Sequence, residues 1–195
     1  RILYLDVDLI INHDIAELYE MPLGDDALAG AADRNGKEFV MGFMSGKERE
    51  TFDTFIKNGY QYFNAGVLLL NIKWLKADTS FDTYTKVMKD WDYNISALDQ
   101  DILNFVFHNE VKYIPWQKYN LFVHLAYNDG MTKDEAVKSS ILHFAGSKPW
   151  CTNDLHYEME SIWWEYAEKS KVSEELMRDY IRRMTQDKTI ELFFK

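Results

Sequence analysis

Short apolar runs that stop abruptly at polar or acidic residues recur along this chain and constrain its fold more than any other feature. Four such runs are present, at residues 1–5, 27–32, 62–72 and 140–144. The first leads directly into Asp6-Val7-Asp8 and the second into Asp33. Runs of this length with polar boundaries are typical of buried strands that deliver polar side chains at their carboxyl ends.

Helical periodicity fills much of the chain between and after these runs. Apolar residues recur at helical spacing in residues 81–91, 97–107, 157–169 and 174–184. Strands that alternate with helices predict an α/β layer structure with a parallel or mixed sheet, in which sites lie outside the carboxyl ends of the strands. At that edge we expect Asp6, Asp8, Asp33 and His143. The polar stretch 34–60 is expected to be a substrate-facing loop or a short helical excursion.

Composition restricts the function classes. With 195 residues, of which 47% are apolar, the chain can bury one ordinary core. Its formal net charge of −10 argues against nucleic-acid binding, which relies on basic residues to release phosphate counterions. An anionic substrate therefore needs a local positive charge, such as a metal ion. Cys151 is the only cysteine, so no intrachain disulfide forms, and no apolar run approaches the ~20 residues that span a membrane.

Three Asp-x-Asp pairs occur, and only Asp6/Asp8 directly follows an apolar strand. Two carboxylates in such low-polarity surroundings repel each other unless a cation lies between them. A hard divalent ion with oxygen ligands is the natural partner. The alternative is a strand-ending turn whose aspartates are solvated.

His143 ends an apolar run and is either a buried core histidine or part of a ligand site. The residues that follow favour the ligand site, because Gly146 allows close backbone approach and Lys148 supplies a charge suited to phosphate. Together they are typical of a lid over an anion.

Asn64-Ala65-Gly66 stands at the mouth of the strongest apolar run. The Asn64 amide can donate and accept hydrogen bonds toward a polyhydroxylated ligand. Alternatively, Asn64 is a turn residue beside a bulge glycine.

Asp99-Gln100-Asp101 lies near the start of a predicted helix. Asp99 is a candidate for ligand binding, or it caps the helix together with Ser96. Consecutive helical residues point about 100° apart, so at most two of the three face one ligand.

Four blocks stand in a fixed order along the chain: Leu3 to Asp8, Phe63 to Leu69, Leu98 to Asn104 and His143 to Trp150. Each block alone is weak evidence, whereas their joint order and spacing are specific. Together they resemble glycosyltransferase family 8, which includes bacterial lipopolysaccharide galactosyl- and glucosyltransferases and is related to glycogenin.

The resemblance implies a GT-A-like nucleotide-diphospho-sugar transferase fold of the α/β class, with a mixed, mostly parallel sheet flanked by helices. Residues 1–150 are expected to form the catalytic core from the metal-binding strand onward, and residues 151–195 a C-terminal helical extension. The N-terminal part that holds the nucleoside in this family is expected to be missing from the chain. An inactive fragment of a longer enzyme is therefore one alternative.

The resemblance also implies the roles of site residues. The manganese ligands are matched by Asp6, Asp8 and His143, with Mg²⁺ as the alternative ion. The segment that closes over the phosphates is matched by Gly146 and Lys148. The donor-binding positions are matched by Asp33, Asn64, Ala65, Gly66, Asp99 and Gln100. The catalytic candidates are Gln100, Asp99 and Asp101.

The implied reaction is a retaining transfer of galactose or glucose from a UDP-sugar to a saccharide or to a lipid-linked, lipopolysaccharide-type acceptor. Either Asp101 or Gln100 is the nucleophile, or the leaving phosphate deprotonates the acceptor in a same-face attack. One alternative is a non-catalytic sugar-binding domain of the same fold. Another is a haloacid-dehalogenase-like phosphatase, whose later acidic motif Gly24-Asp25-Asp26 matches only superficially.

The expected location is the bacterial cytoplasm, with contact to the inner face of the membrane as an option near a lipid-linked acceptor. The residues that would make this contact are Arg178, Arg182, Arg183, Leu192, Phe193 and Phe194. Acidic neighbours favour an ordinary packed helix instead, because surface attachment needs a basic face.

Overall fold

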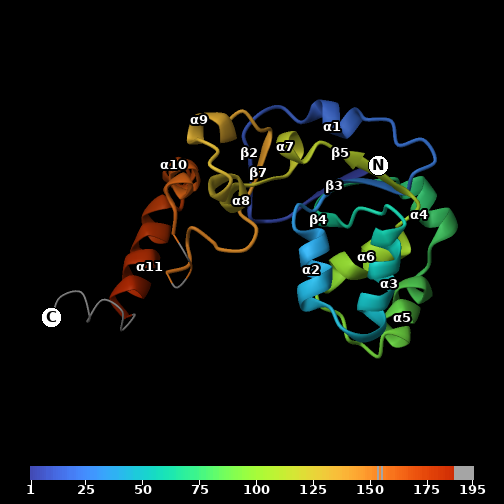
Figure 1. Cartoon of the computed structure of the whole chain (residues 1–195). Helices are drawn as coiled ribbons and strands as arrows, with labels where there is room; N and C mark the ends of the chain where they lie inside the picture. Colours follow the sequence, from blue (N-terminus) through green and yellow to red (C-terminus); the bar gives the residue numbers. More distant parts are fainter. Residues whose placement is uncertain (153, 155, 187–195) are drawn as a thin grey trace. The chain divides into compact units, whose positions relative to one another are not determined.

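The computed structural model describes residues 1–152, 154 and 156–186 (Figure 1). The chain divides into two compact units. Unit 1 comprises Arg1–Asp6 and Asp14–Asn120, and unit 2 comprises Val7–His13 and Leu121–Lys195. The expected separation of a catalytic core, residues 1–150, from a C-terminal extension concerns function and stays a prediction.

Unit 1 holds a four-stranded sheet in the order β1-β4-β3-β5. Its strands are β1 (Ile2–Leu5), β3 (Leu28–Ala32), β4 (Phe63–Leu70) and β5 (Val111–Ile114). The central strand β4 is antiparallel to both β1 and β3, and β3 is parallel to β5. The register between β3 and β4 shifts between Gly30, opposite Leu68, and Ala31, opposite Asn64. This irregularity falls where the Asn64 motif leaves the regular ladder.

Seven helices belong to the described part of unit 1. Their bounds are α1 (Ala16–Glu20), α2 (Gly36–Phe43), α3 (Gly46–Lys57), α4 (Ile72–Asp78), α5 (Phe81–Asp90), α6 (Asp99–Val106) and α7 (Trp116–Tyr119). Figure 1 shows α2, α3, α5 and α6 gathered on one side of the sheet. The core beneath them is strongly aromatic, because the buried rings of Phe52, Tyr62 and Trp91 pack together edge to face.

Unit 2 holds a three-stranded sheet in the order β2-β7-β6. Strand β7 (Ile141–His143) is antiparallel to β2 (Leu9–Ile11) and parallel to β6 (Leu121–Phe122). The helices of this unit are α8 (Val123–Asn128), α9 (Lys133–Ala136), a 3₁₀ turn (Glu158–Glu160), α10 (Ser161–Glu168) and α11 (Ser173–Gln186). No helix in the described ranges is long and apolar enough to cross a membrane.

The strands expected from the apolar runs are confirmed as β1, β3, β4 and β7, and the expected helices as α5, α6, α10 and α11. The polar stretch 34–60 forms two helices, α2 and α3. The mixed α/β class is confirmed, but the expectation of a mostly parallel sheet is wrong in detail, since three of the five pairings between described strands are antiparallel. Strand–helix alternation predicts which elements form, and it does not fix the direction in which the chain re-enters a sheet.

Candidate functional site

A hydrogen-bonded network in unit 1 joins four of the residues expected to bind the donor sugar. The Gln100 Oε1 atom accepts bonds from the Asn64 amide and from the backbone N–H of Ala65, each at 2.9 Å. The Gln100 Nε2 atom donates to Asp33 Oδ2 at 3.5 Å. The first turn of α6, the start of β4 and the end of β3 therefore meet at one polar edge of the sheet.

Asn64 is held from both sides. Its Oδ1 atom accepts from the backbone N–H of Gly66 at 3.0 Å and from the buried Asn120 amide at 2.9 Å. Sequence reasoning predicted Asn64, Ala65 and Gly66 together and did not find Asn120, which lies 56 residues away. No local pattern marks such a partner, because the contact exists only after the chain folds.

The three acidic and amide residues at the start of α6 separate as helical geometry requires. Asp99 is exposed, Gln100 is half-buried in the network, and Asp101 is fully buried. The Asp101 carboxylate accepts bonds from the Tyr62 hydroxyl and from the backbone N–H of Ala97. These bonds commit the Asp101 side chain to Tyr62 and Ala97 and suit it to positioning the loop before α6.

That loop is held by a second buried carboxylate. Glu48 on α3 accepts from the backbone N–H of Ser96 at 3.0 Å and from its hydroxyl at 2.8 Å. The alternative in which Asp99 and Ser96 cap the helix is therefore wrong, because the Ser96 hydroxyl is bonded to Glu48 and the helix begins after Leu98. Leu98 has φ of 51°, a left-handed conformation that is costly for a leucine and is retained where surrounding bonds enforce it.

The buried Asp101 carboxyl is expected to make stability depend on pH. Burial, together with the neighbouring Glu48 carboxylate, raises the pKa of Asp101 to about 7 from its usual value of 3.8. The folded chain therefore keeps a proton that the unfolded chain releases, so this group lowers the free energy of unfolding as pH rises from about 4 to about 7. Urea unfolding at several pH values across this window should show a shallower decline for Asp101→Asn than for the wild-type chain.

Asp25→Asn is the matched control, because Asp25 is exposed and lies outside this cluster. Its pH profile should follow that of the wild type. Identical slopes for the wild type and Asp101→Asn would contradict the assignment of the retained proton to Asp101.

Unit 2 gathers the second group of expected residues around one carboxylate. Asp8 Oδ1 lies 3.3 Å from His143 Nε2, and Asp8 Oδ2 forms an ion pair with Lys148. His143 is buried, and Phe122 packs edge to face against its ring with centroids 5.0 Å apart. The antiparallel pairing of β2 with β7 aligns Leu9 with His143 and so brings Asp8 to the imidazole.

The electrostatics of Asp8 favour its ionised form. Burial alone would raise the pKa of Asp8, but hydrogen bonds and charges of His143 and Lys148 outweigh it and hold that pKa well below its usual range. The segment that carries Lys148 is fixed by a bond from the lysine ammonium to the Phe144 carbonyl at 2.8 Å. Gly146 lies at φ of 79°, which only glycine adopts readily.

Asp6 completes the expected metal-binding set. Only Val7 separates it from Asp8 along the chain, and within unit 2 Asp8 lies beside the His143 imidazole. Two carboxylates and an imidazole are a donor set that suits a hard or borderline divalent cation such as Mn²⁺ or Mg²⁺. The ammonium of Lys148 on Asp8 shows that this carboxylate already attracts a cation.

Sequence reasoning also missed the residue that anchors the whole α6 edge. Asn104 is fully buried, accepts from the backbone N–H of Phe63 at 2.7 Å, and donates to the Gln100 carbonyl at 2.8 Å. Its spacing of four residues from Gln100 places both on one helix face. That spacing is the one signal in the sequence that could have found it.

A family model described as Glycosyl transferase family 8 matches residues 1–154. The chain belongs to this family. Membership confirms the resemblance carried by the four sequence blocks. It excludes the alternative that the chain is a haloacid-dehalogenase-like phosphatase.

Two curated relatives illustrate how this family 8 chain compares with known proteins. "Glycosyltransferase GlyA" of Streptococcus pneumoniae serotype 4 is 26% identical over 168 residues, which are 85% of this chain and 21% of that protein. "Lipopolysaccharide 1,3-galactosyltransferase" of Salmonella typhimurium is 26% identical over 155 residues, 77% of this chain and 44% of that protein. The chain therefore spans less than half the length of each.

Solved structures confirm the GT-A-like fold. An active-site mutant of LgtC matches with a TM-score of 0.65 and 23% identity, over 91% of this chain and 64% of that chain. GlyE of Streptococcus pneumoniae TIGR4 matches with a TM-score of 0.60 and 26% identity, over 93% of this chain and 42% of that chain.

Proposed function

We propose that the protein containing this chain transfers a hexose, galactose or glucose, from a UDP-sugar to a saccharide acceptor with retention of configuration, and that the transfer needs a divalent cation. The Asp8 carboxylate, held between His143 and Lys148, is the observation that carries this proposal. A carboxylate and an imidazole that would hold a cation, with the Lys148 ammonium beside them, suit the binding of a diphosphate.

The residues that would hold the cation are Asp6, Asp8 and His143. A cation bound there supplies positive charge against the diphosphate of the leaving nucleotide. The chain's own contribution follows from Lys148, whose ammonium would leave Asp8 and pair with a phosphate oxygen. Gly146 gives the segment before Lys148 the backbone conformation that this exchange requires.

The Asp33–Asn64–Gln100 network supports binding of the donor sugar. Aspartate and amide groups held by one another can hydrogen-bond several hydroxyls of a hexose without rearranging first. We assign Asp33, Asn64, Ala65, Gly66 and Gln100 to this role, with the exposed Asp99 beside them.

We propose the same-face route for the transfer. Gln100 is a poor nucleophile because it is an amide whose oxygen already accepts two hydrogen bonds. Asp101 is buried and bonded to Tyr62 and Ala97. In the same-face route the bond from the sugar to the diphosphate breaks, the acceptor oxygen bonds to the same carbon, and the acceptor proton passes to the leaving phosphate oxygen.

A saccharide of the lipopolysaccharide type is the acceptor that the name of the galactosyltransferase relative suggests, and we place it at the cytoplasmic face of the membrane. The arginines of α11 give little support to direct membrane contact, because Arg178, Arg182 and Arg183 each pair with an acidic residue of the same helix. Leu192, Phe193 and Phe194 lie outside the described residues.

Removal of divalent cations tests the proposal directly. Release of UDP from UDP-galactose or UDP-glucose is expected to fall at least about 100-fold in excess EDTA, because the leaving diphosphate loses its positive counter-charge. Added Mn²⁺ should restore it. The measurement is a coupled assay of UDP release with and without a saccharide acceptor.

Two outcomes separate the parts of the proposal. Undiminished turnover in excess EDTA would contradict the cation requirement alone. No UDP release from either donor, with Mn²⁺ present and the protein folded, would contradict the choice of UDP-hexose donor.

A further inference from the structure

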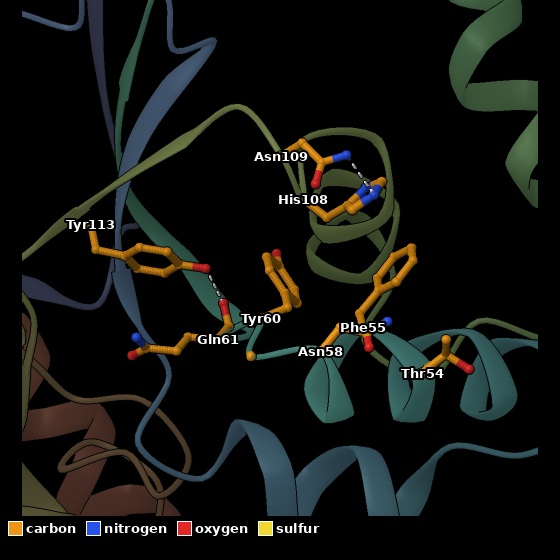
Figure 2. A pocket seen from close by; sticks show the side chains of 9 residues that line it. Thr54, Phe55, Asn58, Tyr60, Gln61, His108, Asn109 and Tyr113 are labelled. Carbon is orange, nitrogen blue, oxygen red and sulfur yellow. Dashed lines mark hydrogen bonds between the residues drawn. The ribbon is translucent and has the colours of Figure 1, made fainter.

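A pocket of about 440 Å³ lies in unit 1 beside the C-terminal ends of α3 and α6 (Figure 2). Phe55 and Asn58 reach it from the end of α3, and Tyr60 from the link to β4. Asn109 reaches it from the turn after α6, and Tyr113 from strand β5. None of the candidate donor or metal residues lines it. Its volume is within the range of roughly 300–1,000 Å³ that is usual for small-molecule sites.

The lining of this pocket is poor in charged residues. Lysine, arginine, aspartate and glutamate make up 28% of the chain, yet none of them is among the described residues that line the pocket. Aromatic rings and side-chain amides predominate instead. A pocket without lysine or arginine is poorly suited to a phosphate or a carboxylate, and one without acidic groups is poorly suited to an amine. Its chemistry matches an uncharged ligand with apolar faces and many hydroxyls.

Contacts within the protein fix the rings of the pocket in place. The Tyr60 hydroxyl donates to Asn104 Oδ1 at 2.7 Å, and the Tyr113 hydroxyl donates to the backbone carbonyl of Gln61. The His108 ring stacks on Phe55, with centroids 4.1 Å apart and planes 11° apart. Figure 2 shows the Tyr60 ring between the Tyr113 and Phe55 side chains. Ordered rings keep the entropic cost of binding low.

The amides supply groups that can bind hydroxyls. The side chains of Asn58 and Gln61 are exposed, and no hydrogen bond joins either amide to another described residue. Each can offer two N–H donors and a carbonyl acceptor, a combination that pairs with neighbouring hydroxyls of a sugar ring. Asn109 has one amide hydrogen committed, since its Nδ2 lies 2.9 Å from His108 Nε2.

We propose that this pocket binds a neutral saccharide, separately from the nucleotide-sugar donor. The exposed face of Tyr113 packs against the apolar side of a pyranose ring, and the amides of Asn58 and Gln61 bind its hydroxyls. Through Tyr60 and Asn104 the pocket contacts α6, one helical turn from Gln100. Saccharide binding here requires neither a divalent cation nor transferase activity, so it can be tested without them.

The experiment titrates the ¹⁵N-labelled chain with lactose, cellobiose and maltose in EDTA and without nucleotide, and follows the side-chain amide signals of Asn58, Gln61 and Asn109. At least one disaccharide is expected to give saturable shifts, at a Kd on the order of 1 mM. Tyr113→Ala and Asn58→Ala should each weaken that binding, Tyr113→Ala by about tenfold.

Tyr19→Ala is the matched control, because Tyr19 is an exposed tyrosine of the same unit on α1 and lies outside the pocket. It should leave the affinity unchanged, and the dispersion of the ¹⁵N spectrum reports whether each variant is folded. Equal affinities of the wild type and folded Tyr113→Ala and Asn58→Ala would overturn the proposal. So would the absence of saturable shifts with all three disaccharides, or saturation of the same signals by uridine alone.

Discussion

Replacing Asp8 with asparagine is expected to lower UDP release from the UDP-hexose donor at least about 100-fold. The amide keeps the size of the side chain but removes the charge that both His143 and Lys148 contact. A neutral oxygen is also a weak ligand for a divalent cation, so affinity for Mn²⁺ should fall in parallel. Turnover at saturating Mn²⁺ and direct titration of Mn²⁺ into each protein are the two measurements.

The chain offers its own control for this variant. Asp92 belongs to another Asp-x-Asp pair, and it is exposed, with only a surface ion pair to Lys47 at 3.4 Å. Asp92→Asn should retain the activity and the Mn²⁺ affinity of the wild type, since surface ion pairs contribute little. If Asp8→Asn matched this control in both measurements, Asp8 could not be a metal ligand.

Replacing Asn104 with alanine is expected to lower the free energy of unfolding by about 3–5 kcal/mol. The Asn104 side chain is fully buried and satisfies both the N–H and the carbonyl of Phe63, each at 2.7 Å. It also accepts from Tyr60 and donates to the Gln100 carbonyl. Alanine would remove the side-chain partner of the Phe63 N–H and carbonyl in a buried site, and each unsatisfied group costs about 1–3 kcal/mol. Urea unfolding at neutral pH measures the difference.

Asn35→Ala serves for comparison. Asn35 precedes α2, is exposed, and makes no side-chain capping bond to that helix. Its loss should change the free energy of unfolding by less than about 0.5 kcal/mol. A loss below about 1 kcal/mol for Asn104→Ala would show that water or a rearranged partner replaces the missing amide.

The elements that sequence reasoning predicted are those whose signal is local. An apolar run such as residues 67–70 is buried on both faces, so hydrophobicity alone indicates strand β4. The amphipathic stripe of α5 is likewise visible in the sequence. Strand β6, with two residues, and helix α7, with four, are too short to give any periodicity.

The residues of the candidate site also separate into those with a local sequence signal and those without one. Asp8, Asn64 and Gln100 lie in motifs, and a motif can be read from adjacent residues. Asn120 and Glu48 act through bonds that span 56 and 48 residues, and no spacing rule connects such positions. Their roles follow from tertiary packing, which also decided that Ser96 bonds to Glu48 rather than capping α6.

The hydrogen bonds that the Asn64 and Gln100 amides already make limit which further bonds they can form with a ligand. A carboxamide has two lone pairs on oxygen and two hydrogens on nitrogen. Asn64 Oδ1 and Gln100 Oε1 each accept two hydrogen bonds from the protein. The amide nitrogens of the same two residues each donate one hydrogen bond to a protein acceptor. One hydrogen per amide is left to face outward. These two amides can therefore donate hydrogen bonds to ligand oxygens, but they cannot accept hydrogen bonds from ligand hydroxyls.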